Sequence, residues 1–318
     1  MRLKKVFVLV IDNIKEFLRK SRKNTYILLL WNRYRRIREL CVYHIMDDQK
    51  FIKRTYKKRL CKEVNLENPM TFTEKLNWLK LNYRNNLMEQ CADKYSVRKY
   101  VSECGFDYLL NPLLGYWDNV NDIDVLELPE KFVLKASHGS GWNIICTDKS
   151  KLNMKLYKKI MKCWLKTNIY YSGREWVYSN IQPRIICEKY IETNGMDLKD
   201  YKIFCFSGKP KYIQVDGDRF TEHKRVYYDT NWNKQNFQYG EYGTEYIAEK
   251  PIKLDEMLSI SKKLSAPFPF ARVDFYNINN KIIFGEITFF PDAGFAKFTP
   301  DEMDLEMGKL LELPNKNT

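Results

Sequence analysis

Residues 271–291 read ARVDFYNINNKIIFGEITFFP and hold the most informative pattern in this chain. Two β-rich runs flank the polar tetrapeptide NINN, an arrangement that predicts an antiparallel hairpin. Each run carries an acid among bulky apolar residues, Asp274 in the first and Glu286 in the second. Facing carboxylates on adjacent strands can hold Mg²⁺ against phosphate oxygens. Arg272, two residues before Asp274, is expected on the same strand face, where it or a lysine could instead neutralise both acids.

A glycine-containing loop follows a lysine in FVLKASHGSGWNIIC, residues 132–146. Lys135 stands near the end of an apolar run that predicts a strand. The backbone N–H groups of Gly139, Ser140 and Gly141 can approach phosphate oxygens closely, and Lys135 supplies a positive charge. Strand lysines usually face solvent and glycine turns are usually only hairpins, so these two features alone indicate a phosphate site weakly.

Two further runs contain polar residues at the ends of predicted strands. The run RIICEKYIE ends in Glu188–Glu192, which could form a hinge that carries an adenine ring, with Glu192 in reach of the ribose. The alternative is an edge strand that enters a loop. In DYKIFCFSG, Lys202 opens the next strand and is either directed at a phosphate or solvated.

The remaining sequence predicts a mixture of helices and antiparallel strands. Thr71 followed by Glu74 forms a capping box, and residues 152–164 carry an apolar residue at every fourth position, as in an amphipathic helix. Residues 299–302 (TPDE) give a second helix-start signal, with Thr299 ahead of a proline. The chain lacks a regular βαβ alternation and any GxGxxG or GxxxxGK[ST] motif, which argues against a Rossmann domain and a P-loop NTPase. We expect an α+β fold.

The basic excess of the chain is concentrated near its N-terminus. The 318 residues carry a net charge of +14, of which residues 1–60 hold +13, with 18 Lys and Arg against 5 Asp and Glu. The apolar runs VFVLVI and YILLLW are too short to span a membrane, and the first ends at Asp12. They alternate with basic segments, as in a helix lying on an anionic membrane surface; a solvated helix or a protein-docking surface are the alternatives. We expect no nucleic-acid partner, because the chain after residue 60 is nearly neutral.

The eight cysteines are widely spaced, with no two closer than 13 residues. Zinc ribbons and compact disulfide frameworks need tighter spacing. Several cysteines lie in apolar strand-like runs such as IICTD and KIFCFSG, where a thiol packs as a small hydrophobic group. We therefore expect reduced, structural cysteines and a cytoplasmic protein.

In their order along the chain, these motifs resemble one protein family. The segments ADKYSVRKYV, FVLKASHGSGWNIIC, DYKIFCFSGKP and ARVDFYNINNKIIFGEITFFP are similar to the TupA-like ATP-grasp family, which is associated with bacterial teichuronopeptide and capsular-polysaccharide synthesis. The resemblance covers about residues 65–312. It implies an ATP-grasp fold, in which two α+β subdomains grip a nucleotide, preceded by a basic helical arm. The expected division is an arm over residues 1–60, a helical part over 61–130, a subdomain with the glycine loop and hinge over 131–191, and a subdomain with the metal site over 192–318.

The resemblance also implies roles for single residues. Those expected to bind ATP are Lys94, Lys135, His138, Gly139, Ser140, Gly141, Glu188, Lys189, Tyr190, Ile191 and Glu192. The expected Mg²⁺ ligands are Asp274 and Glu286, with Thr288 where many ATP-grasp enzymes have asparagine, a departure that leaves open whether one or two metals bind. The expected catalytic residues are Arg272, for charge developing on an acyl phosphate, and Lys202.

The implied activity is an ATP- and Mg²⁺-dependent ligase that joins an amine to a uronic-acid carboxylate on a glycan or lipid-linked glycan. Residues 1–60 would hold it at the inner face of the plasma membrane. The alternative is a glycosyltransferase on the same scaffold that uses a nucleotide sugar, for which the DxD-like string Asp216-Gly217-Asp218 is a candidate. A third interpretation is a membrane-bound scaffold with a degenerate nucleotide site, against which the retained Lys135, Asp274 and Glu286 argue. The acceptor, the amine and the oligomeric state stay open.

Overall fold

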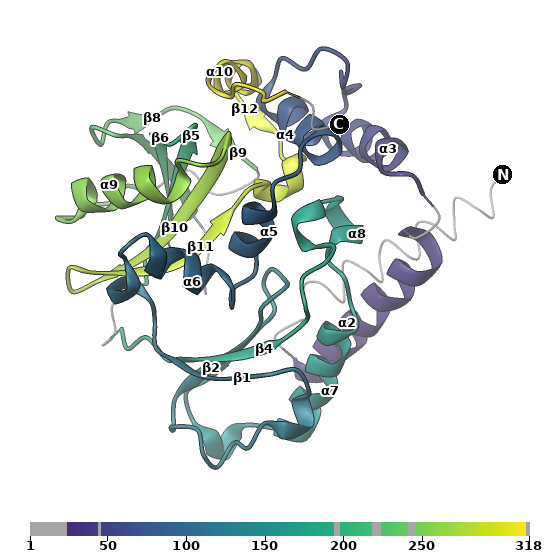
Figure 1. Ribbon diagram of the computed structural model, residues 1–318, viewed down its shortest axis with the longest axis vertical. Coiled ribbons are helices and arrows are strands. Elements are labelled where there is room, and N and C mark those ends of the chain that lie inside the picture. Colours follow the sequence, from purple (N-terminus) through teal and green to yellow (C-terminus); the bar gives the residue numbers. More distant parts are fainter. Residues whose placement is uncertain (1–23, 44–45, 194–197, 218–223, 241–245, 316–318) are drawn as a thin grey trace. The chain divides into compact units, whose positions relative to one another are not determined.

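The computed structural model describes residues 24–43, 46–193, 198–217, 224–240 and 246–315. The chain forms two compact units that interleave along the sequence (Figure 1). The first unit contains Met1–Met46, Pro112–Ser172 and Gln182–Tyr190, and the second contains Asp47–Asn111, Gly173–Ile181 and Ile191–Thr318. Both units combine helices with an antiparallel sheet, which confirms the α+β class.

A four-stranded antiparallel sheet forms the centre of the first unit. Its strands are β1 (Leu113–Trp117), β2 (Phe132–Ala136), β3 (Asn143–Cys146) and β4 (Ile185–Lys189), in the order β1-β4-β2-β3. Along β2, the buried side chains Phe132, Leu134 and Ala136 alternate with partly exposed ones. One face of this sheet is therefore apolar, and the other face is free to carry polar groups.

Helices α2 (Thr25–Arg38) and α7 (Met154–Leu165) pack against each other in the first unit. The apolar spacing predicted for residues 152–164 is confirmed, since Leu156, Ile160 and Trp164 are buried. Asn32 of α2 is buried as well, so this basic helix is part of the folded body of the unit. The shorter helical segments of this unit are Glu39–Tyr43, Val120–Asp122, Lys149–Lys151 and the start of α8 (Tyr170–Gly173).

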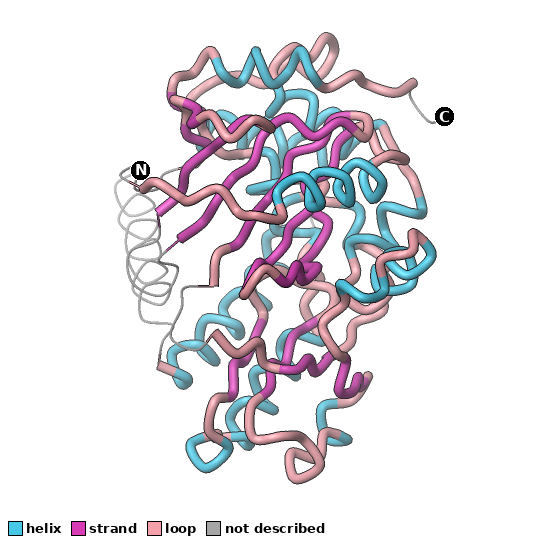
Figure 2. Tube along the Cα trace, turned by 90° about the vertical axis from the view of Figure 1, so that its left-hand side faces the viewer, coloured by secondary structure: helices cyan, strands magenta, loops and turns pink. Residues whose placement is uncertain are grey.

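A larger antiparallel sheet organises the second unit, and its strands run side by side in Figure 2. They are β5 (Asp200–Phe206), β6 (Lys209–Gly217), β7 (Lys224–Asp229), β8 (Lys234–Gln235), β10 (Phe270–Ile278) and β11 (Lys281–Thr288), in the order β11-β10-β5-β6-β7-β8. A separate two-stranded sheet pairs β9 (Gln238–Tyr239) with β12 (Phe298–Thr299). The predicted hairpin at residues 271–291 is the β10–β11 pair.

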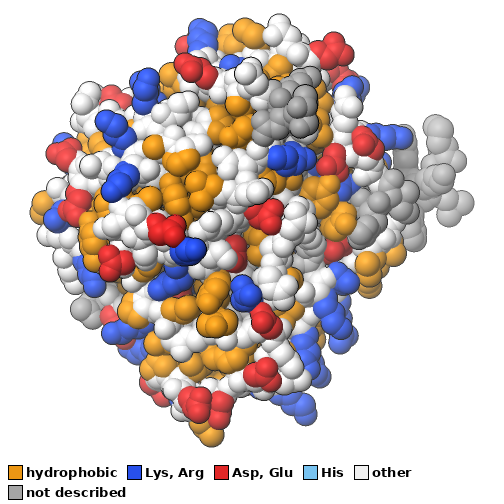
Figure 3. Space-filling model, viewed as in Figure 1, with side chains coloured by type: hydrophobic (Ala, Val, Ile, Leu, Met, Phe, Trp, Pro, Cys, Tyr) orange, Lys and Arg blue, Asp and Glu red, His pale blue; other side chains and the backbone are white. Residues whose placement is uncertain are grey.

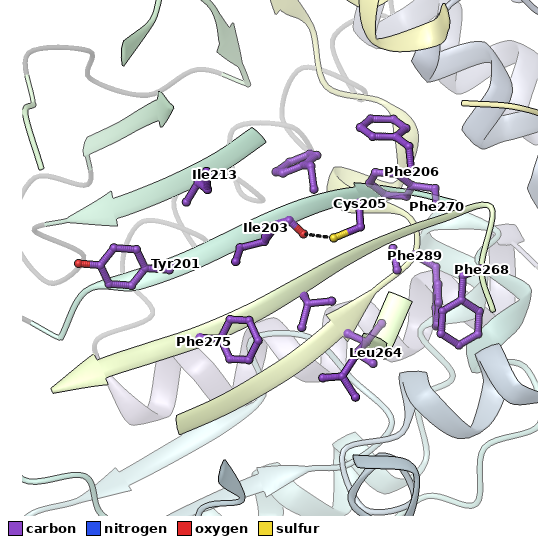
Figure 4. Packing of buried hydrophobic residues seen from close by; sticks show 14 of the residues in the cluster. Tyr201, Ile203, Cys205, Phe206, Ile213, Leu264, Phe268, Phe270, Phe275 and Phe289 are labelled. Carbon is purple, nitrogen blue, oxygen red and sulfur yellow. Dashed lines mark hydrogen bonds between the residues drawn. The ribbon is translucent and has the colours of Figure 1, made fainter. Parts of the chain in front are cut away.

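One face of the larger sheet packs on helix α9 (Leu254–Ser265) and forms a hydrophobic core. Figure 4 shows Tyr201, Ile203 and Cys205 of β5 in this core, at alternate positions along the strand. Leu264 of α9 and Phe275 of β10 lie in the same cluster. The residues between them on each strand must then face the opposite side of the sheet.

The opposite face is apolar at one end and polar at the other. Phe204, Phe206 and Phe270 make up the apolar end, where Phe72 packs edge-on to Phe270 at a centroid distance of 5.0 Å. Phe72 is the first residue of α4 (Phe72–Asn82), and the predicted capping box of Thr71 precedes it and is confirmed. The polar end carries the charged residues described below.

The remaining helices of the second unit are α3 (Asp48–Leu60), α5 (Asn86–Ala92), α6 (Val97–Glu103), α10 (Met303–Leu310) and the short segments Asp107–Leu109, Trp176–Tyr178 and Pro291–Gly294. Helix α3 buries Phe51, Ile52 and Tyr56, so α2 and α3 belong to different units. The helix-start signal predicted over residues 299–302 is followed by α10, which begins at Met303 with Glu302 as its N-cap, whereas the Thr299 backbone pairs with Gln238.

Among the described residues no helix is long and apolar enough to cross a bilayer. The run VFVLVI, residues 6–11, lies outside the described residues. All eight cysteines are free thiols, and those in the apolar strand-like runs, such as Cys146 and Cys205, are buried. The face drawn in Figure 3 has Lys and Arg interspersed with Asp and Glu.

Candidate active site

Asp274 and Glu286 face each other across the β10–β11 hairpin as direct register partners. The turn residues Asn279 and Asn280 have left-handed φ values of 50° and 61°, as in a two-residue hairpin turn. Regular pairing from this turn would place Gly285 opposite Asp274 and point Glu286 to the other face of the sheet. A shift in register beside Asp274 skips Gly285 as a β-bulge and brings Glu286 to the polar face. A Cβ at Gly285 would lie only 2.9 Å from the backbone oxygen of Asp274, so glycine suits this position.

Arg272 neutralises both acids. Its Nε donates to Asp274 Oδ1 at 2.8 Å and its Nη2 to Asp274 Oδ2 at 2.7 Å. The same Nη2 donates to Thr288 Oγ1 at 3.1 Å and lies 3.7 Å from Glu286 Oε1. Thr288 in turn donates to Glu286 Oε1 at 3.3 Å. The sequence analysis allowed this ion-pair network as the alternative to a metal site, and in it Arg272 binds both oxygens of Asp274.

The two acids differ in how readily they hold a proton. Burial raises the pKa of Asp274 to about 6, and the neighbouring Arg272 and Lys202 only partly oppose this effect. Burial also acts to raise the pKa of Glu286, but Lys94 and Arg272 outweigh it and lower that pKa to about 2. Glu286 is therefore the stronger anion of the pair near neutral pH.

Lys94 and Lys202 bring two further positive charges to this face. Lys94, in the turn between α5 and α6, places its Nζ 3.3 Å from Glu286 Oε2. Lys202 pairs with Asp200, two residues earlier on β5, and its Nζ lies 3.9 Å from Asp274 Oδ2. The structure thus brings together six predicted residues of the second unit, namely Lys94, Lys202, Arg272, Asp274, Glu286 and Thr288.

The polar row continues into β6 and β7 through Gln214, Asp216 and Arg225, of which the sequence analysis singled out only Asp216, as part of the DxD-like string. Asp216 Oδ2 lies 3.2 Å from Lys202 Nζ, and Arg225 Nε donates to Asp216 Oδ1 at 2.8 Å. Gln214 also donates to both Asp216 oxygens. The available signal was the alternation in KYIQVDG, where Gln214 and Asp216 stand two residues apart in an otherwise apolar strand.

The loop after β11 is held by a buried lysine. Lys80 donates to Asn77 Oδ1 at 3.0 Å, to the Gly173 oxygen at 2.8 Å and to the Ala293 oxygen. Within this loop Asp292 and Ala293 have left-handed φ values of 48° and 53°, which are unfavourable for residues other than glycine. Lys80 is buried and Glu175 is partly buried. Loss of hydration lowers the pKa of Lys80 and raises that of Glu175, each to about 7.

The donor set of the hairpin fits Mg²⁺. No group of three or more His, Cys, Asp or Glu side chains suited to a metal occurs within the described residues. Asp274 and Glu286 offer only carboxylate oxygens, and Mg²⁺ is commonly held by one or two carboxylates together with substrate phosphates. The Thr288 hydroxyl next to Glu286 adds a third oxygen.

The first unit contains a second charged pair. Lys135 on β2 and Glu188 on β4 lie on the same sheet face, with 2.7 Å between Lys135 Nζ and Glu188 Oε2. Val133 of β2 lies on this face too, and its partner Ile145 on β3 is exposed. A lysine, a carboxylate and apolar side chains thus share one accessible surface.

The glycine loop follows β2 in a tight turn closed by a hydrogen bond from the Ala136 N–H to the Trp142 oxygen at 3.0 Å. A Cβ at Gly139 would lie 2.2 Å from Trp142 Cε3, and Gly141 has a φ of 68°. Ser140 is exposed. His138, by contrast, is buried, with its Nε2 3.0 Å from the Trp164 oxygen. Ser140 and Gly141 are thus exposed, whereas Gly139 is buried beside Trp142 and the His138 ring packs inward.

The rest of the predicted hinge lies where the chain leaves the first unit. Lys189 ends β4, with an exposed side chain and a backbone N–H bonded to the Pro112 oxygen at 3.0 Å. Tyr190 is the last residue of the first unit, and its ring lies 5.9 Å from Lys131 Nζ. Ile191 and the exposed Glu192 belong to the second unit. Their predicted contacts with adenine and ribose stay predictions.

Comparison with known proteins identifies the family of this chain. The family described as TupA-like ATPgrasp matches residues 74–312. The chain belongs to this family. No curated protein sequence matched it. The matched region includes the hairpin acids, the glycine loop, Lys94, Lys135 and Lys202.

Solved structures similar to this TupA-like ATP-grasp chain include distant ligases. D-alanine–D-alanine ligase from Bacillus anthracis is 18% identical, with 69% of this chain and 65% of that chain covered and a TM-score of 0.40. For the Helicobacter pylori D-Ala-D-Ala ligase the identity is 19%, the coverage 76% and 69%, and the TM-score 0.42. The L-amino acid ligase from Bacillus licheniformis is 14% identical, with 73% and 52% covered and a TM-score of 0.45. The chain thus spans about two thirds of the length of the B. anthracis ligase and about half the length of the B. licheniformis ligase.

Proposed function

We propose that this protein is an ATP- and Mg²⁺-dependent carboxylate–amine ligase that acts through an acyl phosphate. The observation that carries the proposal is the pairing of cations with carboxylates along one sheet face. The pairs are Lys94 with Glu286, Arg272 with Asp274, and Lys202 with Asp200 and Asp216. When ATP binds, its phosphate oxygens would take over the cations, and Mg²⁺ would take over Asp274 and Glu286. Cations and carboxylates would therefore both keep a partner of opposite charge.

The proposed reaction needs positioning and charge neutralisation rather than a protein nucleophile. The substrate carboxylate attacks the γ-phosphoryl group, a C–O–P linkage forms, and ADP leaves. The amine then attacks the acyl carbon, a C–N bond forms, phosphate leaves and the amine loses a proton to solvent. Arg272 and Lys202 would neutralise charge on the phosphoryl oxygens in both steps. Bound through Asp274 and Glu286, Mg²⁺ would supply electrostatic stabilisation of the phosphates.

The first unit offers nucleotide contacts of its own. Lys135 would exchange Glu188 for a phosphate oxygen, and the backbone of Gly139 to Gly141 would cover the phosphates. The apolar side chains of Val133 and Ile145 share the Lys135 face and suit a purine ring. The related solved structures include a D-alanine–D-alanine ligase complexed with ATP, which motivates the choice of nucleotide.

Release of ADP from ATP tests this activity. Purified protein is incubated with ATP, Mg²⁺, a panel of uronic acids and a panel of amines, and the amide product is measured by mass spectrometry. Wild type is expected to form an amide, and Lys135→Ala is expected to lose at least about 100-fold in rate. Lys151→Ala is the matched control, because this lysine of the same unit is exposed and pairs only with Asp148 nearby. Equal amide yields from wild type and Lys135→Ala would contradict the site assignment.

The finer part of the proposal is an amide on a uronic-acid-containing glycan or its lipid-linked precursor, made for a bacterial surface polysaccharide. Its support is the family to which the chain belongs. The glycan from cells with and without an intact gene would be compared by mass spectrometry. Loss of an amide substituent is expected, and an unchanged glycan would contradict this role.

The glycosyltransferase alternative has weaker support. A DxD motif binds a metal and a sugar nucleotide through accessible carboxylates, but Asp216 is buried in β6 and held by Arg225 and Gln214. Asp218 lies outside the described residues. Calorimetry with ATP and with UDP- or CMP-sugars separates the two activities, because binding of a sugar nucleotide without ATP would favour the transferase.

We also propose that the protein works on the cytoplasmic side of the membrane, with α2 at the lipid surface. Tyr26, Leu30, Arg33 and Ile37 are exposed and follow each other at helical spacing, so α2 presents an apolar stripe with a basic residue in it. The full chain should sediment with vesicles of anionic phosphatidylglycerol and less with phosphatidylcholine. A variant with Leu30→Ser and Ile37→Ser should lose this binding, whereas Leu126→Ser, at an exposed loop leucine, should keep it.

A further inference from the structure

Helix α2 lies outside residues 74–312, the part of the chain matched by the family, yet its buried face packs closely on α7 of the same unit. Trp164 of α7 donates from Nε1 to Asn32 Oδ1 at 3.0 Å. Both side chains are almost fully buried, with exposed fractions of 4% for Asn32 and 2% for Trp164. A buried indole N–H without an acceptor is costly, so Asn32 fixes where this tryptophan sits.

Trp164 connects α2 to the glycine loop in two ways. Its backbone oxygen lies 3.0 Å from His138 Nε2, at the start of the loop. Its ring is parallel to that of Trp142 within 2°, at a centroid distance of 6.2 Å, which is an offset stack. His138 also meets Trp142 edge-on at 5.4 Å. The loop is therefore closed at both ends by groups that rest on Trp164.

Arg35 of α2 contacts the same cluster directly. Its guanidinium carbon lies 5.3 Å from the centroid of the Trp142 ring, within the range of a cation–π interaction. The Trp142 ring also lies against Gly139, where no Cβ would fit. Movement of this ring would let the loop backbone change its path.

We propose that Asn32 and Arg35 are positioning residues, which hold the glycine loop in the conformation that binds the phosphates of ATP. This inference rests on the proposed function for the use of the loop, but not for the contacts themselves. It assigns α2 two distinct faces: the inner face supports the loop through Trp164 and Trp142, and the outer face is exposed. Helix α2, which precedes the matched region, then supports the nucleotide site without forming part of it.

Two measurements on the full-length protein test the proposal, with Asn32→Ala and Arg35→Gln as the variants. Hydrogen exchange of the peptide spanning residues 136–146, without nucleotide, should become about tenfold faster in each variant. The dissociation constant for Mg²⁺·ATP should rise about tenfold, while kcat at saturating ATP stays within about twofold of wild type. Arg35→Lys keeps a cation over the ring and should recover most of the affinity. Arg33→Gln, an exposed arginine on the same helix, should change neither quantity.

The outcomes separate the inference from the proposed function. Unchanged exchange of residues 136–146 in both variants would overturn it, whatever the activity. Faster exchange with unchanged ATP affinity would overturn the positioning role. In that case α2 would stabilise the loop, but the conformation of the loop would not affect ATP binding. If wild type binds no ATP, the proposed function fails and the positioning role fails with it. Should Arg35→Gln prove unfolded by circular dichroism, the Lys variant and Asn32→Ala still decide.

Discussion

Arg272 and Asp274 stand two residues apart on β10 and are joined by two hydrogen bonds of 2.8 and 2.7 Å, in a fork-to-fork arrangement. Both side chains are largely buried, with exposed fractions of 10% and 4%. Burial acts to lower the pKa of Arg272, but Asp274 and, to a lesser extent, Glu286 and Asp200 outweigh it and raise that pKa above its usual value. The pair is therefore a stable ion pair without ligand, and either member becomes a buried charge when the other is removed.

Removal of Arg272 should destabilise the protein as well as inactivate it. Arg272→Met leaves Asp274 with only Lys202 nearby, and the free energy of unfolding in urea is expected to fall by about 3 kcal/mol. The double variant Arg272→Met with Asp274→Leu should regain most of this stability, because neither charge is left unpaired. Neither variant should form amide. A double variant no more stable than Arg272→Met would show that the pair is not coupled.

Mg²⁺ and nucleotide should bind cooperatively. Without nucleotide, Lys94 and Arg272 compete with Mg²⁺ for Glu286 and Asp274, and phosphate oxygens draw these cations away. Calorimetric titration of Mg²⁺ should show an affinity about tenfold higher or more with ADP present than without it. Lys94→Ala should strengthen binding of Mg²⁺ alone, whereas Lys99→Ala, an exposed α6 residue paired with Glu103, should not. Equal Mg²⁺ affinity with and without ADP would contradict the exchange of partners.

Gly285→Val should disrupt the site while every charged residue remains. A Cβ 2.9 Å from the Asp274 oxygen forces the bulge to rearrange, at a cost of about 1–3 kcal/mol in the free energy of unfolding. Displacement of Glu286 should lower the rate at which ADP is formed from ATP by about 100-fold. Lys281→Ala, at the exposed start of β11, provides the control for substitution in this hairpin. A fully active Gly285→Val protein would show that the bulge does not position Glu286.

The charges of Lys80 and the nearby, partly buried Glu175 should make stability depend on pH around neutrality. Burial raises the pKa of Glu175 from 4.5 to about 7, so its contribution to stability is present below pH 4.5 and is lost as the pH rises to 7. Burial lowers the pKa of Lys80 from 10.5 to about 7, so its contribution is present above pH 10.5 and is lost as the pH falls to 7. The two effects combine into a minimum near pH 7.

Urea unfolding at pH 5, 7 and 9 measures this minimum. The double variant Lys80→Met with Glu175→Gln should flatten the profile across this range. The change is specific to the pair if Lys309→Met with Glu306→Gln, an exposed pair on α10, leaves the profile as in wild type. A wild-type profile without a dip near pH 7, or one that the double variant leaves unchanged, would remove the pair as its cause.

Sequence patterns predicted the elements of the site better than their mutual orientation. The capping box at Thr71, the amphipathic α7 and the β10–β11 hairpin all follow from local periodicity, which depends on residues close in sequence. The polar row through Gln214, Asp216 and Arg225 depends on the pairing of β5, β6 and β7, which no local pattern encodes. The facing of Asp274 and Glu286 was correctly predicted, but the reason is the bulge at Gly285, which the hairpin pattern alone does not include.

The same limit explains the incomplete prediction for the N-terminal segment. Its charge indicated an arm, whereas the burial of Asn32 depends on a tryptophan 132 positions later in the chain. Helix α3 likewise buries Tyr56, whose hydroxyl lies 2.8 Å from Thr73 Oγ1. Composition reports how many charges a segment carries, but not which of its faces is covered.

The β-bulge at Gly285 gives a parity rule for recognising inactive relatives. With a two-residue turn, side chains on opposite strands of a hairpin share a face only when their residue numbers differ by an odd number. Asp274 and Glu286 differ by an even number, so their meeting requires one skipped residue. A relative can therefore keep both acids and lose the site through a single inserted residue, or through a bulky side chain at the skipped position. In a relative with a two-residue turn, the two acids meet if their numbers differ by an even number and a bulge is present, or by an odd number and no bulge is present. Any other combination indicates a pseudoenzyme that keeps the motif.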